Sequence, residues 1–237
     1  MTAPIIVVPL ALEWLLIVTA LTPLTFRGKF GTNPNLGITL WFGLFVSGIV
    51  SILATLTVSI WALFELVEVG ADSKLLTLEL ASNLGIWALL ALAGITLAQI
   101  NQKTEPLVQE ANAIRPELAK TGVDDGFFAG FPVKRIELPM PLLFTAGQTI
   151  YVSSGAKSVL SELELEAALW HEVGHIRAAH EAIKTLAKFA ETLTPRIRAS
   201  NIMASEVDRL SELAADRFAT TKVAKAVLES ARAKFLE

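Results

Sequence analysis

The 237-residue chain has no cysteine, only three histidines and a single tyrosine. Without cysteine, disulfide bonds and thiolate metal ligands are excluded, so any metal site must use other ligands. Charge is scarce in the first 100 residues, which hold three of the 20 Lys and Arg and five of the 23 Asp and Glu. The remaining residues are nearly neutral in sum and form no basic run, so nucleic-acid binding has no support.

Apolar residues dominate the part of the chain that lacks charge. They make up 53% of the whole sequence, and the mean hydropathy of +0.54 is too high for an ordinary soluble protein. Three stretches are predicted to cross a membrane, at about residues 5–24, 36–64 and 75–100. The second is uncharged over 29 consecutive residues, and the first lacks the basic start of a cleaved signal peptide.

The loops between these stretches predict how the chain is oriented. The first, Thr25–Asn35, contains Arg27 and Lys29 without an acid, whereas Glu65–Lys74 contains three acids and one lysine. Because basic loops remain in the cytoplasm, we expect the first loop inside and the N-terminus outside. The C-terminal half then lies in the cytoplasm, attached to a multi-pass protein of the cell membrane.

The chain is therefore divided into a membrane region, residues 1–100, and a cytoplasmic domain, residues 101–237. Glu13 and Glu79 lie within predicted spans, where each is either a functional acid or a residue near the membrane surface. The sequence leaves both interpretations open.

The second half has the pattern of a mainly helical α+β domain with a small sheet. Two segments have strand character, and helical patterns precede and follow them. The strands are expected at 133–138 and 148–153, a loop at 122–132, and helices at 101–120 and from about residue 162 to the C-terminus with a break at Pro195.

Residues 171–175 read His-Glu-Val-Gly-His, which is the most informative segment of the chain. On a helix, His171 and His175 lie one turn apart on the same face and can bind one zinc ion. Glu172 beside them can act as general base on a water molecule. Ser161 and Glu164 form a capping-box pattern upstream, so a helix is predicted from there through the motif.

A zinc peptidase site needs a third protein ligand. His180 stands five residues after His175, about 140° around the helix, and does not fit. Glu212 is the best candidate, with Asp216 four residues later to accept a hydrogen bond from a ligand histidine. Considered alone, this pair is also typical of a solvated helix face.

These residues resemble the HtpX-like family of membrane zinc metallopeptidases, which are gluzincins related to CaaX prenyl proteases and minigluzincins. The resemblance rests on His171–Ile176, on Glu212–Asp216, and on Phe144–Gly155 leading into Glu162–Glu166. It covers roughly residues 130–220. The membrane half is similar only in having hydrophobic spans before the catalytic domain.

The resemblance implies a gluzincin-type peptidase domain with one zinc ion per chain. The implied ligands are His171, His175 and Glu212, with Glu172 as general base and Asp216 as support for a ligand. It also implies an edge strand that pairs with the substrate main chain, with the candidate residues Phe144, Ile150, Tyr151 and Val152.

Two features depart from the family pattern. Leu142 and Leu143 precede Phe144 where family members often have Asn-Ala, which puts the details of the substrate edge in doubt. After His180 no apolar stretch is long enough for the additional spans that HtpX proteins usually carry.

The predicted function is a membrane-anchored zinc endopeptidase acting on membrane-associated or misfolded proteins, with the lipid bilayer and the protein substrate as partners. Two alternatives remain: a sensor protease that cuts one regulator, and a non-catalytic adaptor in which zinc only holds helices together. Glu172 argues against the adaptor, because a purely structural zinc site needs no general base. An oxyanion donor is also expected, and the candidates are Tyr151, His180, Arg209 and Arg217.

Overall fold

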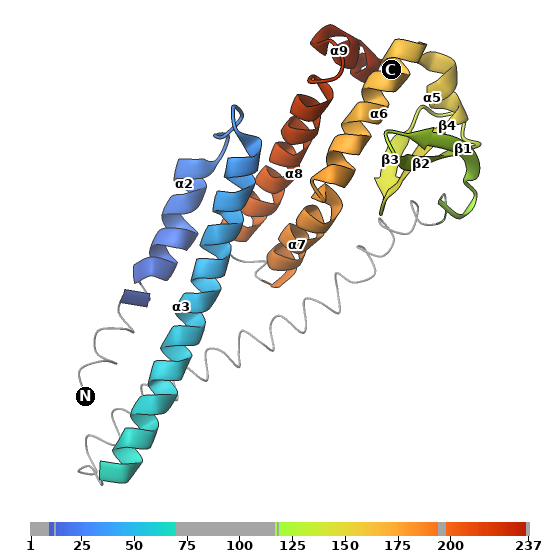
Figure 1. Cartoon of the computed structure of the whole chain (residues 1–237). Helices are drawn as coiled ribbons and strands as arrows, with labels where there is room; N and C mark the ends of the chain where they lie inside the picture. The colour runs from blue at the N-terminus through green and yellow to red at the C-terminus, as the bar shows by residue number, and fades with distance from the viewer. Residues whose placement is uncertain (1–9, 12, 70–116, 118, 194–197, 236–237) are drawn as a thin grey trace.

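The computed structural model describes residues 10–11, 13–69, 117, 119–193 and 198–235. Within them the chain is mostly helical, with one small sheet (Figure 1). The helices are η1 (Ile17–Leu21, a π-helix), α2 (Thr22–Phe26), α3 (Pro34–Val69), α5 (Ser154–Val159), α6 (Glu162–Arg177), α7 (His180–Leu193), α8 (Arg198–Ala219) and α9 (Lys225–Ala233). The strands are β1 (Val123–Phe128), β2 (Phe131–Ile136), β3 (Leu143–Ala146) and β4 (Thr149–Ser153).

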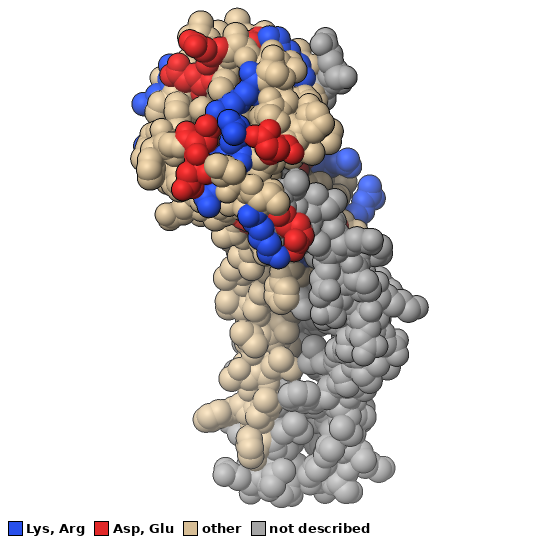
Figure 2. All heavy atoms as spheres, turned by 90° about the vertical axis from the view of Figure 1, so that its right-hand side faces the viewer, with Lys and Arg blue, Asp and Glu red and all other residues tan. Residues whose placement is uncertain are grey.

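Helix α3 is the one described helix that is long and apolar enough to cross a membrane, over Pro34–Val58. Proline suits its first position, because that N–H has no partner inside the helix. Only 17% of its most apolar window is buried inside the molecule. In Figure 2 the charged residues gather on the upper body, and none is seen on this face of the described helical part below it.

The other two predicted spans are described only in part or not at all. Glu13–Phe26 is an apolar helical segment, which is shorter than a span requires. The stretch 75–100, with Glu79, lies outside the described residues, as does almost all of the helix expected at 101–120. Glu13 is exposed.

The sheet is mixed and has the strand order β1-β2-β4-β3. The pairs β1–β2 and β3–β4 are antiparallel, and β2 and β4 run parallel. The two predicted strands correspond to β2 and β4. Strand β1 lies where a loop was expected from Gly122, Gly126, Gly130 and Pro132, and that expectation was wrong. The pairing of β1 is irregular between Asp124 and Phe127.

Helix α6 lies between the sheet and α8, so its motif residues are enclosed on both sides (Figure 1). Its sheet side packs on a core that includes Ile150 and Val152. A second core joins Met203, Val207 and Leu210 of α8 to α7 and to the start of α3. The apolar N-terminal half and the C-terminal half therefore share a core.

The basic loop before α3 is attached to α8. Arg209 donates a hydrogen bond of 2.8 Å to the main-chain oxygen of Lys29, and Arg217 donates to that of Thr32. Added side-chain bulk at Gly37 would meet Phe30 at 2.7 Å and Leu210 at 2.8 Å, so α3 and α8 are in close contact there. The loop and α8 consequently lie on the same side of any membrane that α3 crosses.

Candidate metal site

The helix that carries the His-Glu-Val-Gly-His segment begins where the sequence predicts. Ser161 is its N-cap, and the reciprocal hydrogen bonds with Glu164 complete a capping box. The Glu164 carboxylate also accepts hydrogen bonds from Ser230 at 2.6 Å and Lys234 at 2.6 Å. Lys234, then Ser230 and Ser161, hold the pKa of Glu164 far below its usual range. The start of α6 is thereby connected to the C-terminal segment.

Gly174 allows α6 and α8 to approach closely. A Cβ atom at this position would lie 3.0 Å from the Ala215 Cα and 3.3 Å from the Phe218 ring. Ala215, which lies between Glu212 and Asp216 in the sequence, is fully buried. Small residues on both helices thus bring Glu212 and Asp216 close to the histidines.

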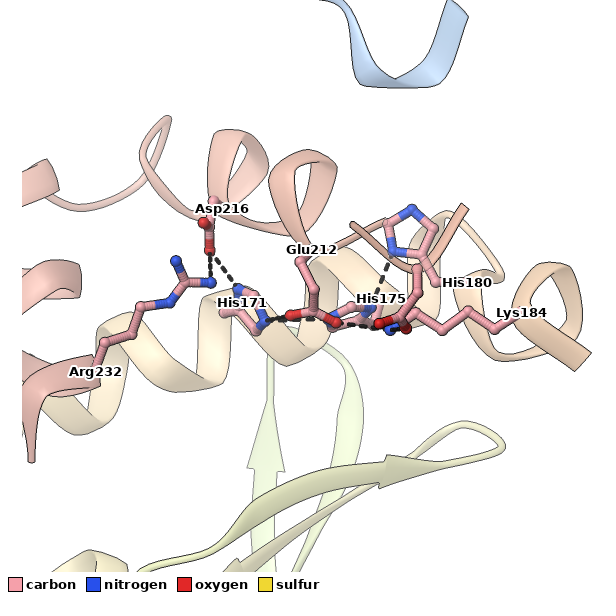
Figure 3. Close-up of polar contacts among 8 residues, drawn as sticks. His171, His175, His180, Lys184, Glu212, Asp216 and Arg232 are labelled. Atoms are coloured by element: carbon pink, nitrogen blue, oxygen red, sulfur yellow. Dashed lines mark hydrogen bonds and ion pairs between the residues drawn. The ribbon is translucent and has the colours of Figure 1, made fainter. Parts of the chain in front are cut away.

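His171, His175 and Glu212 converge at one point, as Figure 3 shows. The two Nε2 atoms are 3.0 Å apart, and the Glu212 carboxylate oxygens lie 3.4 Å from His171 Nε2 and 3.5 Å from His175 Nε2. One donor atom from each residue lies within 4.8 Å of the others. The structure therefore brings together the three residues that were expected as ligands.

This arrangement has the dimensions of a zinc site. Donor atoms about 2.0–2.2 Å from one tetrahedral zinc ion are separated from each other by about 3.3–3.6 Å. The separation of 3.0 Å between the two Nε2 atoms is close to that range, and each Nε2 atom has a different oxygen of Glu212 at 3.4 or 3.5 Å. Two imidazoles and one carboxylate are also a donor set that zinc accepts, and the group could hold this ion.

Asp216 lies on the other side of His171. Its Oδ1 atom is 2.9 Å from His171 Nδ1 and 2.5 Å from the Arg232 guanidinium of α9. Burial opposes protonation of His171, but the Asp216 and Glu212 carboxylates outweigh it and raise the pKa to about 9. The contact with Asp216 places a proton of His171 on Nδ1, so that Nε2 is the atom that could bind a metal once it has lost its own proton. Arg232 was not singled out from the sequence, since no motif or spacing connects it to the site.

Lys184 of α7 is a second cation that the sequence did not reveal. Its Nζ atom lies 2.7 Å from Glu212 and 2.8 Å from Asp208 (Figure 3). Burial disfavours its charged form, but the Asp208 and Glu212 carboxylates prevail and raise its pKa. Hydrogen bonds from His171 and His175 are the main reason that the pKa of Glu212 is strongly lowered. Glu212 is thus an anion surrounded by donors.

His180 is a neighbour of His175, although its spacing in the sequence excluded it as a third ligand. Helix α6 ends at Arg177, and the chain turns through Ala179, whose φ of 52° is left-handed. As a result, the Nδ1 atoms of His180 and His175 lie 3.0 Å apart. Burial, and then the nearby His175, lower the pKa of His180 to about 4, so its ring is neutral.

Glu172 lines a cavity of about 180 Å³ together with two of the three expected ligands, His171 and Glu212. His171 and Glu212 form its polar wall, and Leu143, Leu228 and Phe235 contribute apolar surface. A group bound in this cavity could therefore contact Glu172 and the expected ligands His171 and Glu212 at the same time.

The edge strand that was expected to pair with the substrate is only partly where the sequence placed it. Strand β4 is paired on both sides, so the main chain of Ile150, Tyr151 and Val152 has no open edge. Strand β3 is the edge strand next to α6, and it contains Phe144. The prediction was wrong for β4 because two apolar strands cannot be ordered within a sheet from their composition alone.

The expected oxyanion donors lie elsewhere. Tyr151 is buried and stacked on Phe144, at a ring distance of 5.0 Å. Arg209 and Arg217 contact the loop before α3. His180 lies against Nδ1 of His175, whereas the metal-facing atom is Nε2. Arg232 is the cation that lines the cavity.

Comparison with models of known protein families and with curated proteins finds no match to this chain.

Proposed function

We propose that the protein is a membrane-anchored zinc endopeptidase of the HtpX-like, gluzincin type, which hydrolyses membrane-associated or misfolded proteins from the cytoplasmic side. The observation that carries the proposal is the convergence of His171, His175 and Glu212 beside a cavity lined by Glu172. A site that only held helices together would not need an open cavity or a neighbouring carboxylate.

Each residue has a distinct role in the proposed reaction. His171, His175 and Glu212 would hold the ion, and Asp216 would orient His171. A bound zinc ion would polarise the scissile carbonyl and lower the pKa of a water molecule. Glu172 would take a proton from the attacking water and deliver it to the leaving amine as the carbon–nitrogen bond breaks.

The edge strand β3 supports a polypeptide as substrate. An extended chain can add to an open strand through main-chain hydrogen bonds, which do not depend on its sequence. Leu143 of this strand also lines the cavity with Glu172. A substrate paired to β3 would therefore pass the site.

The N-terminal part supports attachment to a membrane. Helix α3 exposes apolar side chains where a soluble protein would bury them, with Val46, Val50 and Leu53 each more than half exposed. The basic loop before α3 is bound to α8, which favours a cytoplasmic position for both.

The test compares the detergent-purified protein with its Glu172→Gln variant, measuring zinc content and hydrolysis of casein. We expect one zinc ion per chain in both proteins, hydrolysis by the unaltered protein that a chelator abolishes, and a loss of at least about 10²-fold in the variant. Glu162→Gln, an exposed change in the first turn of the same helix, is the control and should retain activity.

Two outcomes would contradict the proposal. Undiminished hydrolysis by the Glu172→Gln protein would exclude the assigned general base. Stoichiometric zinc without hydrolysis of any protein substrate would favour the non-catalytic adaptor.

A further inference from the structure

We infer that His180 is a positioning residue for His175, which it holds in the orientation and tautomer that metal binding requires. The inference rests on the proposed zinc site and adds a residue that lies outside its ligands. It gives His175 a partner at Nδ1, as Asp216 is the partner of His171.

The main chain is shaped to bring the two rings together. On a continuous helix, a residue five positions after His175 would point about 140° away. Here α6 stops at Arg177, and Ala179 adopts a φ of 52°, which residues other than glycine seldom do. Helix α7 then starts at His180, whose ring meets that of His175 edge to face, with centroids 5.0 Å apart and planes at 78° (Figure 3).

The contact determines which nitrogen of His175 carries the proton. Its Nε2 atom points to His171 and Glu212, so it must present a lone pair to a metal, and the proton must sit on Nδ1. The Nδ1 atom of His180 is 3.0 Å from that position and can accept the hydrogen bond. His180 must then carry its own proton on Nε2.

The surroundings of His180 favour a neutral ring. Its side chain is only 1% exposed, and its Nε2 atom has no hydrogen-bond partner among the described residues. A charged imidazolium would bury two strong donors with too few acceptors. A neutral acceptor also avoids adding a further carboxylate to a site that already contains Glu172, Glu212 and Asp216.

Three substitutions at this position separate hydrogen bonding from simple packing. In His180→Leu the acceptor is lost. In His180→Asn the amide oxygen lies three bonds from Cα, as Nδ1 does in histidine, and can take the position of Nδ1. In His180→Gln the amide oxygen lies four bonds from Cα, as Nε2 does in histidine, and is near the position of Nε2. The zinc dissociation constant of each detergent-purified protein is measured by competition with a coloured chelator, and thermal unfolding without metal reports on the fold.

We expect His180→Leu to weaken zinc binding about 10- to 100-fold, His180→Asn to restore most of the affinity, and His180→Gln not to restore it. Wild-type affinity in the leucine variant, or equal restoration by asparagine and glutamine, would overturn the inference while leaving the zinc site intact. Failure of the unaltered protein to bind zinc would instead overturn the proposed function, and the inference with it.

A measurement on the unaltered protein avoids any dependence on how the variants fold. The chain has only three histidines, so labelling their rings with ¹⁵N gives signals from this cluster alone. With zinc bound, we expect His180 to be protonated on Nε2 and to accept a hydrogen bond at Nδ1. A His180 ring protonated on Nδ1 in the zinc-bound protein would refute the assigned role.

Discussion

At the scale of single residues, each of the three candidate metal ligands has a second contact. Asp216 contacts His171, His180 contacts His175, and Lys184 contacts Glu212. Such contacts matter because a ligand that can rotate or change tautomer loses part of its affinity for the ion. These three supporting residues come from α7 and α8, so the site depends on both of these helices.

Replacement of Asp216 by alanine should weaken zinc binding about 10- to 100-fold, because His171 loses the group that fixes its tautomer. The dissociation constant for zinc, measured by chelator competition, checks this. Asp124→Ala is a suitable control, since that carboxylate is 91% exposed on β1 and distant from the site in the sheet order. An Asp216→Ala protein that binds zinc as tightly as the control would show that the contact is unimportant.

At the scale of helices and strands, the contact between α6 and α8 decides whether the three candidate ligands come together. Neither helix alone carries a complete ligand set, and Gly174 and Ala215 set how near they come. The N-terminus of α6 is separately anchored through Glu164 to the C-terminal segment. Two predictions follow from these features.

Gly174→Ala should destabilise the protein by up to about 2 kcal/mol, because overpacking of about 1–3 kcal/mol outweighs the gain in helix propensity of about 1 kcal/mol. It should also lower zinc affinity, since α8 must move with Glu212. Thermal unfolding without metal and chelator competition measure the two effects. Gly43→Ala on α3 is the control, because its added Cβ would meet nothing within 4 Å. Equal stability of the two variants would contradict the prediction.

The Glu164 carboxylate should make stability depend on pH. Its pKa in the folded protein is far below the unfolded value of about 4.3, so the folded state binds fewer protons and loses this stabilisation as pH falls. The midpoint of thermal unfolding should be lower in Glu164→Gln than in the unaltered protein at pH 7, and the difference should shrink below about pH 4. Glu162→Gln should show no comparable difference, and a gap that stays constant with pH would refute the assignment.

At the scale of the whole molecule, the long helix α3 connects two environments. Its first turns belong to the core with α7 and α8, whereas its later turns expose apolar side chains. A single helix with both properties is expected if the body rests at a membrane surface and the helix continues into the bilayer.

The protein should therefore remain in membranes after alkaline carbonate extraction, and immunoblotting of pellet and supernatant checks this. Because the chain has no cysteine, single cysteines can also report sidedness. A cysteine at the exposed Lys225 should react with an impermeant maleimide only after cells are opened, whereas one at Thr2 should react in intact cells. Release by carbonate would contradict membrane insertion, and labelling of Lys225→Cys in intact cells would reverse the orientation.

The sequence alone predicted the features that depend on local spacing. The capping residues located the start of α6, the motif located two candidate ligands, and the spacing of Glu212 and Asp216 pointed to a third. Strands β2 and β4 were likewise visible as segments of strand character, the second of them with an apolar run. These features depend on residues a few positions apart in the sequence, so their spacing can be read directly from it.

Only the tertiary structure decided how distant segments combine. It placed β3 rather than β4 at the sheet edge, turned the chain at Ala179 so that His180 met His175, and brought Lys184 and Arg232 to the site. Strand order and helix docking result from the packing of whole surfaces, which no short pattern encodes. The ligands could therefore be named from the sequence, but the residues that hold them in place could not.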